Sequence, residues 1–172
     1  MTICEDIRDD TYATKPVHEY ATKDVDVIFN ISSSPYTKDK MKERVRLLER
    51  HAQESGAHMV YVNQVGGQDE LVFDGASMVM TPRGCLQHVS KRFEEDISIV
   101  DTDKECHDYS FDVITEDQYV YAQMVDAMKL GLKDYLAKTG IQDVVIGVSG
   151  GIDSALSLSL LAQVLPPERI HA

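Results

Sequence analysis

The sequence of 172 residues lacks the features of several common protein classes. It has no run of about 18 apolar residues, so no membrane-spanning helix is predicted. Its first ten residues, MTICEDIRDD, are acidic and hold no long apolar core, so no signal peptide is predicted. Basic residues are scarce, because 17 Lys and Arg face 29 Asp and Glu, for a net charge of -12. This charge argues against nucleic acid or an anionic membrane surface as the main partner.

Cysteine is also scarce, with Cys4, Cys85 and Cys106 as its only occurrences. They form no CxxC pair and no metal-binding spacing with histidine, so no zinc site is predicted. An odd number of cysteines without a secretory signal predicts reduced thiols and a cytoplasmic protein.

The first half of the sequence has the pattern of an α/β protein. Residues 38–55 follow a helical period that places Met41, Val45, Leu48 and Ala52 on one face. Asp74-Gly75 predicts the turn of a hairpin between residues 71–73 and 77–80. Further strands are expected at residues 25–30, 58–67 and 85–93.

The composition changes after Phe93, where the chain becomes acidic and only weakly periodic. We therefore predict one domain over residues 1–95, a linker over 96–116 and a second domain over 117–172. The second domain is expected to contain a helix over 117–139, a strand over 144–148 and a helix over 152–165.

The turn Ser149-Gly150-Gly151 joins this last strand to the last helix. Such a turn exposes N–H groups at the positive end of a helix dipole, which favours an anion with several oxygens. The stretch is not a P-loop, since no lysine occurs between residues 141 and 172. Asp153 would repel a phosphate unless a cation lay between them, and Mg²⁺ is the simplest such cation. The alternative is a tight turn in which Asp153 only begins the helix.

The segment SGGIDS, residues 149–154, resembles the pyrophosphate-binding loop of the N-type ATP pyrophosphatases. The wider run from residue 132 is similar to the start of the NAD synthetase domain in that superfamily. The resemblance implies that ATP activates deamido-NAD and that ammonia then forms the amide of NAD. It implies Mg²⁺ bound by Asp153, and ATP contacts from Ser149, Gly150, Gly151, Ile152, Asp153 and Ser154.

The segment ICED around Cys4 resembles the nucleophile segment of the nitrilase superfamily. Together with NISSSPY at residues 30–36, VYVNQVGGQDELVFDGAS at 60–77 and TPRG at 81–84, it is similar to the glutamine-hydrolysing domain of glutamine-dependent NAD synthetases. By this resemblance the Cys4 thiolate attacks the glutamine amide, and Glu5, Ser34 and Lys40 contact the glutamine. Without the resemblance, a buried inert thiol is the simpler interpretation of Cys4. Asp69 and Glu70 would line the pocket or form a solvated turn.

Together the two resemblances imply part of a nitrilase-like αββα sandwich, followed by the first βα unit of a Rossmann-like adenine-nucleotide domain. The glutamate and lysine of the nitrilase triad are expected upstream of Cys4, and only three residues precede Cys4 here. The chain alone is therefore expected not to hydrolyse glutamine, to expose an apolar sheet face, and to form a homo-oligomer when full length. Two alternatives stay open: a nitrilase-like amidase joined to another ATP pyrophosphatase, and a truncated product without catalysis.

Overall fold

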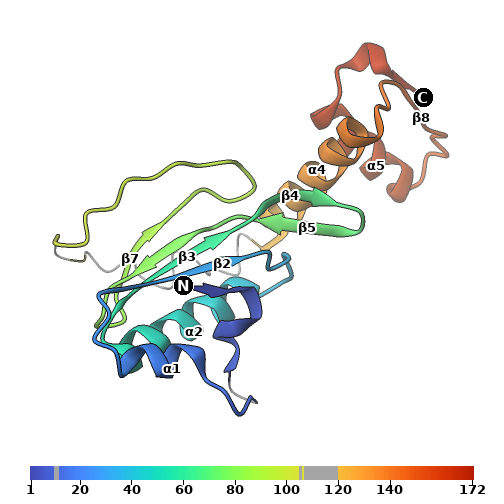
Figure 1. Cartoon of the computed structure of the whole chain (residues 1–172). Coiled ribbons are helices and arrows are strands. Elements are labelled where there is room, and N and C mark those ends of the chain that lie inside the picture. Colours follow the sequence, from blue (N-terminus) through green and yellow to red (C-terminus); the bar gives the residue numbers. More distant parts are fainter. Residues whose placement is uncertain (10–11, 105, 107–119) are drawn as a thin grey trace.

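The computed structural model describes residues 1–9, 12–104, 106 and 120–172 (Figure 1). The described elements, in chain order, are β1 (Thr2–Ile3), the 3-10 helix η1 (Cys4–Ile7), α1 (Pro16–Ala21), β2 (Val27–Ser32), α2 (Lys40–Ser55), β3 (His58–Asn63), β4 (Val65–Gln68), β5 (Leu71–Asp74), β6 (Met78–Met80), β7 (Leu86–Val89), α4 (Val120–Thr139), β8 (Val144–Val145), α5 (Ile152–Val164), the 3-10 helix η4 (Pro167–Arg169) and β9 (Ile170–His171). This mixture confirms the predicted α/β class.

The main sheet has five strands in the order β1-β2-β3-β6-β7. Strands β1, β2 and β3 run parallel, while β3, β6 and β7 pair in antiparallel fashion. Helices α1 and α2 cover one face of this sheet (Figure 1). The predicted apolar stripe of α2 is confirmed, since all four of its residues are buried in the core: Met41, Val45, Leu48 and Ala52.

The opposite face of the main sheet is apolar and exposed. Along β2 the burial alternates, so that Ile28 faces the helices whereas Phe29 and Ile31 are 48% and 50% exposed. Ile3 on β1 and Val62 on β3 are exposed as well. The expected exposed apolar face is therefore confirmed.

The predicted hairpin around Asp74-Gly75 is wrong. Strand β5 pairs with β4 in a separate two-stranded sheet, and β6 returns to pair with β3. The turn of the real hairpin is Asp69-Glu70, where Asp69 has a φ of 49°. Gly75 has a φ of 65° and lies where the chain leaves the hairpin for the main sheet. The expected strand over residues 58–67 is accordingly divided between β3 and β4.

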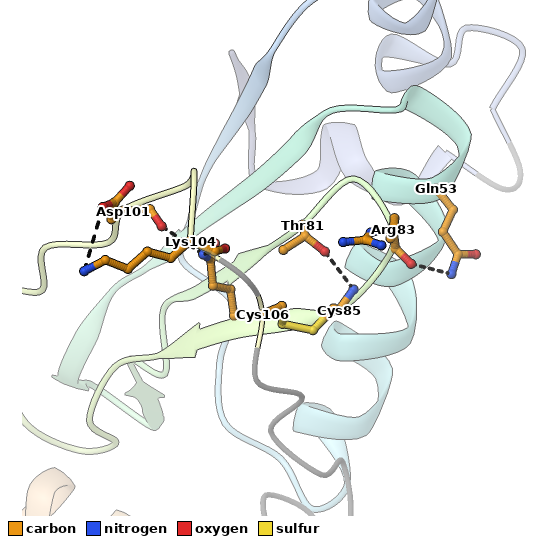
Figure 2. The surroundings of a disulfide bond; sticks show 8 residues. Gln53, Thr81, Arg83, Cys85, Asp101, Lys104 and Cys106 are labelled. Carbon is orange, nitrogen blue, oxygen red and sulfur yellow. Dashed lines mark hydrogen bonds and ion pairs between the residues drawn. A yellow bond between two sulfur atoms is a disulfide. The ribbon is translucent and has the colours of Figure 1, made fainter.

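A disulfide joins Cys85 to Cys106, so the prediction of reduced thiols is wrong for these two residues (Figure 2). Cys85 lies just before β7, and its backbone N–H donates to Thr81 Oγ1 at 3.1 Å. The side chain of Gln87 on β7 donates to the carbonyl oxygens of Asp101 and Lys104, which lie close to Cys106 in the sequence. These bonds hold Asp101 and Lys104 against β7.

The second predicted domain contains α4 and α5, which pack together, and the short parallel pair β8 and β9. Strand β8 covers only two residues of the expected strand over 144–148, because β9 offers two residues for pairing. The predicted start of the helix at 117–119, and most of the predicted linker 96–116, lie outside the described residues. In the part of the chain that the structure describes, no helix has the length and apolar character needed to cross a membrane.

Candidate functional site

Cys4 lies at a sharp turn between β1 and η1. Its φ of 45° places it in the left-handed region, which costs a non-glycine residue roughly 1–3 kcal/mol. The turn is held by Asp6, whose Oδ2 accepts the N–H of Ile3 at 2.8 Å, and by Asn30, whose Nδ2 lies 3.4 Å from the Cys4 carbonyl oxygen. A strained strand-to-helix turn is how several hydrolases present a nucleophile. The Cys4 thiol is free and partly exposed.

Cys4 opens into a cleft of about 700 Å³ between η1, the loop after β2, and α2. All four residues predicted for catalysis and glutamine binding line this cleft: Cys4, Glu5, Ser34 and Lys40. Glu5 and Ser34 are 29 residues apart, so the fold rather than the local sequence brings the two segments together. Asp69 and Glu70 do not line it and form the β4–β5 turn instead.

Ser34 is buried and is held by hydrogen bonds to Asn63 and Arg44. Its N–H donates to Asn63 Oδ1 at 2.9 Å, and its carbonyl oxygen accepts from Arg44 Nη2 at 2.7 Å. The Arg44 Nε and the Ser34 Oγ are 3.3 Å apart. Its backbone groups and its hydroxyl oxygen are thus fixed by Asn63 and Arg44, and this fixed residue lines the cleft.

Arg44, Asp74 and Arg92 form a buried charge cluster that the sequence reasoning missed. Asp74 Oδ1 accepts from Arg44 Nη1 at 2.8 Å, and Oδ2 accepts from Arg92 Nη2 at 3.0 Å. One sequence signal was available: Arg44 lies on the apolar stripe of α2, next to Val45. A charge on such a stripe requires a buried partner, because an isolated buried charge is costly.

Two further side chains set the polarity of the cleft. Lys40 Nζ lies 2.7 Å from Glu43 Oε2, and this hydrogen bond lowers the pKa of the Glu43 carboxyl. The buried side chain of Tyr61 reaches the cleft from β3, and was also missed. Burial raises the pKa of Tyr61, although the positive charge of Arg44 opposes that shift. Tyr61 therefore stays a neutral hydroxyl in the wall of the cleft.

The second predicted site, the loop over residues 149–154, is solvent-exposed at the start of α5. Gly150 has a φ of 87°, whereas Gly151 has a φ of -82°. Gly150 therefore has the left-handed backbone conformation that favours glycine, and Gly151 does not. Ser154 Oγ donates to the Gly151 carbonyl oxygen at 3.1 Å and lies 3.2 Å from Ser149 Oγ.

Asp153 lies in the first turn of α5 with its side chain in solvent. Among residues 1–9, 12–104, 106 and 120–172, no group of three or more His, Cys, Asp or Glu side chains is placed to hold a metal ion.

The fold is that of a carbon–nitrogen hydrolase unit followed by the start of an NAD synthase unit. The sequence model of the carbon-nitrogen hydrolase family matches residues 1–110, and that of NAD synthase matches residues 124–172. The chain belongs to the carbon-nitrogen hydrolase family. Within that family it belongs to the glutamine-dependent NAD(+) synthetases, which are ligases.

Individual relatives agree with this assignment. The chain is 33% identical over 183 residues to glutamine-dependent NAD(+) synthetase of Synechocystis sp. The match covers 99% of this chain and 32% of that protein. It is 36% identical over 154 residues to the Rhodobacter capsulatus enzyme of the same name, with 88% and 28% covered. The chain thus spans about a third of the length of the curated relatives it matches.

Solved structures agree as well. The glutamine-dependent NAD+ synthetase from Acinetobacter baumannii, in complex with ADP, superposes with a TM-score of 0.78 at 29% identity, covering 98% of this chain and 31% of that one. The glutamine-dependent NAD(+) synthetase from Cytophaga hutchinsonii shares the fold with a TM-score of 0.68 at 22% identity.

Proposed function

We propose that this chain forms part of an ATP-dependent ligase that converts deamido-NAD to NAD with ammonia released from glutamine. The observation that carries the proposal is the cleft, in which Cys4 on its left-handed turn meets Glu5, Ser34 and Lys40. The names of the relatives support glutamine as the nitrogen donor and NAD as the product.

In the proposed reaction the Cys4 thiolate attacks the side-chain amide carbon of glutamine. The C–N bond then breaks, ammonia leaves with a proton, and a glutamyl thioester remains on Cys4. Water later hydrolyses the thioester to glutamate and frees the thiol. Ser34 and Lys40 bind the glutamine, and Glu5 shapes the pocket beside the nucleophile.

The 172 residues alone are expected not to release ammonia from glutamine, because the nitrilase triad also needs a glutamate base and a lysine that the resemblance does not assign to any residue of this chain. In the whole protein the ammonia would reach deamido-NAD, whose carboxylate ATP has activated. The domain limits 1–95, 96–116 and 117–172, the homo-oligomer and the cytoplasmic location stay predictions.

The loop over residues 149–154 is proposed to bind the pyrophosphate of ATP. Gly150 at positive φ and the first turn of α5 leave N–H groups exposed, which suits an anion. The Acinetobacter baumannii relative was solved in complex with ADP, which supports the use of an adenine nucleotide. Mg²⁺, if bound by Asp153, would neutralise phosphate charge next to the carboxylate.

Cys4→Ala, made in the complete protein that contains this chain, tests the first half of the proposal. Glutamine-dependent NAD synthesis should be lost, while synthesis from added ammonium should stay within about twofold of the parent, because the thiol only generates ammonia. The ammonium reaction is the internal control for folding. Retained glutamine-dependent synthesis would show that Cys4 is not the nucleophile.

Asp153→Asn tests the second half by calorimetric titration with pyrophosphate and MgATP. Binding of MgATP should weaken at least about tenfold, while binding of metal-free pyrophosphate should not weaken, because the N–H groups remain. Asp143→Asn is the matched control, since Asp143 is an exposed acid that contacts His171 instead. Equal MgATP binding by Asp153→Asn and the parent would leave Asp153 as a helix-start residue only.

A further inference from the structure

The β4–β5 hairpin is held by α4 through both backbone groups of one glycine. The N–H of Gly67 donates to Asp134 Oδ2 at 2.7 Å. The carbonyl oxygen of Gly67 accepts a short hydrogen bond from Lys138 Nζ, which also lies 3.3 Å from Gln68 Oε1. Figure 1 shows the hairpin lying alongside α4.

Glycines make this close approach possible. A Cβ atom on Gly67 would lie 3.0 Å from the Gly131 Cα and 3.2 Å from the Asp134 Cβ. A Cβ atom on Gly131 would in turn lie 3.1 Å from Val72 Cγ2 on β5. Backbone therefore packs against backbone, and the hairpin has little room to move on the helix.

The same hairpin is bonded to the loop that carries Ser34. The N–H of Tyr36 donates to the Val72 carbonyl oxygen at 2.7 Å. Asn63, two residues before β4, holds both backbone groups of Ser34. Asp74, the last residue of β5, holds the Arg44 side chain that binds the Ser34 carbonyl oxygen.

A two-stranded hairpin alone is only marginally stable in water, so its order depends on what it packs against. Here α4 provides that support on one side and the Ser34 loop lies on the other. Loss of the support at Gly67 would loosen the hairpin. The hydrogen bond from Tyr36 to Val72, which fixes the loop that carries Ser34, would then be loosened as well.

We propose that the β4–β5 hairpin couples α4 to the Ser32–Tyr36 loop, with Asp134 as a positioning residue that acts through Gly67. The position of α4 then sets the position of the cleft wall that carries Ser34. The meaning of this coupling for glutamine use rests on the proposed function, whereas the coupling itself is a property of the fold.

Amide hydrogen exchange, read residue by residue by NMR on the 172-residue chain, tests the proposal. In Asp134→Ala the Gly67 amide should exchange about tenfold faster or more, since a charged acceptor is lost. The amides of Ser34 and Tyr36 should exchange at least about threefold faster, because local opening spreads through bonded neighbours. Amides in the middle of α2 should keep their rates.

Asp126→Ala is the matched control, because Asp126 is on the same helix and pairs only with Lys129 in the contacts described. It should leave the Gly67, Ser34 and Tyr36 rates unchanged. Asp134→Asn keeps an oxygen acceptor for the Gly67 N–H and should restore protection. If Asp134→Ala does not fold, the same exchange rates are measured in Lys138→Ala. That substitution removes the exposed lysine side chain that donates to the Gly67 carbonyl oxygen.

Faster exchange at Gly67 with unchanged rates at Ser34 and Tyr36 would overturn the coupling. An unchanged Gly67 rate, or no rescue by Asp134→Asn, would overturn the role of Asp134. Failure of the complete protein to hydrolyse glutamine would contradict the proposed function. It would not change the exchange rates expected here, so the two proposals fail separately.

Discussion

Replacing Asp74 by asparagine removes a carboxylate that pairs with two guanidinium groups, those of the buried Arg44 and the half-buried Arg92. The Asp74 side chain is 1% exposed and that of Arg44 is 3% exposed, so water cannot replace the lost partner. Arg92 lies on the other carboxylate oxygen and also packs over the Tyr36 and Phe93 rings. The substitution keeps the shape of the side chain and changes only its charge.

Removing one partner from a buried ion pair costs about 3–5 kcal/mol, because the remaining charge stays desolvated. For a chain of this length each 1 kcal/mol shifts the melting temperature by about 2–4 °C, so a fall of roughly 6–20 °C is expected. Arg44 keeps its bonds to the carbonyl oxygens of Ser34 and Pro35, which places the expected loss near the lower end.

Urea unfolding followed by far-ultraviolet circular dichroism measures the loss. Asp39→Asn is the matched control, because Asp39 is an exposed acid that pairs with Lys42. An exposed pair of this kind contributes about 1 kcal/mol or less. If Asp74→Asn and Asp39→Asn lose the same free energy of unfolding, the buried cluster makes no special contribution and the reasoning is refuted.

Three further predictions concern stability. Replacing Cys85 and Cys106 together by serine should lower the free energy of unfolding by about 3 kcal/mol, because the disulfide closes a loop across a separation of 21 residues. Equal urea midpoints of the parent with and without a reductant would contradict this. The raised pKa of Tyr61 adds stability that is present below pH 10 and is lost as the pH rises through the folded-state pKa. Tyr61→Phe should therefore lose less stability than the parent in alkaline solution. Parallel profiles of unfolding free energy against pH would exclude burial as the cause. Gly150→Ala should cost roughly 1–2 kcal/mol more than Gly151→Ala, because only Gly150 has a positive φ; equal thermal shifts would argue against the loop geometry.

Parts of this structure follow from local sequence alone. The stripe of α2 was predictable, since residues three and four apart share a helix face whatever the rest of the chain does. The turn at Ser149-Gly150-Gly151 and the start of α5 were predictable for a similar reason, because glycine and a following helical period act over a few residues. The roles expected of Cys4, Ser34 and Lys40 came from resemblance, and the sequence could not show that one cleft gathers them.

The tertiary structure decided which segments pair. Asp74-Gly75 has the composition of a hairpin turn, yet Asp74 lies opposite Arg44, thirty residues away, and its chain returns to β3. Cys85 and Cys106 gave no spacing signal, and only the approach of Asp101 and Lys104 to Gln87 on β7 brings them together. Turn and helix preferences act between neighbours, whereas strand pairing and buried charge depend on which distant groups must be satisfied once water is excluded.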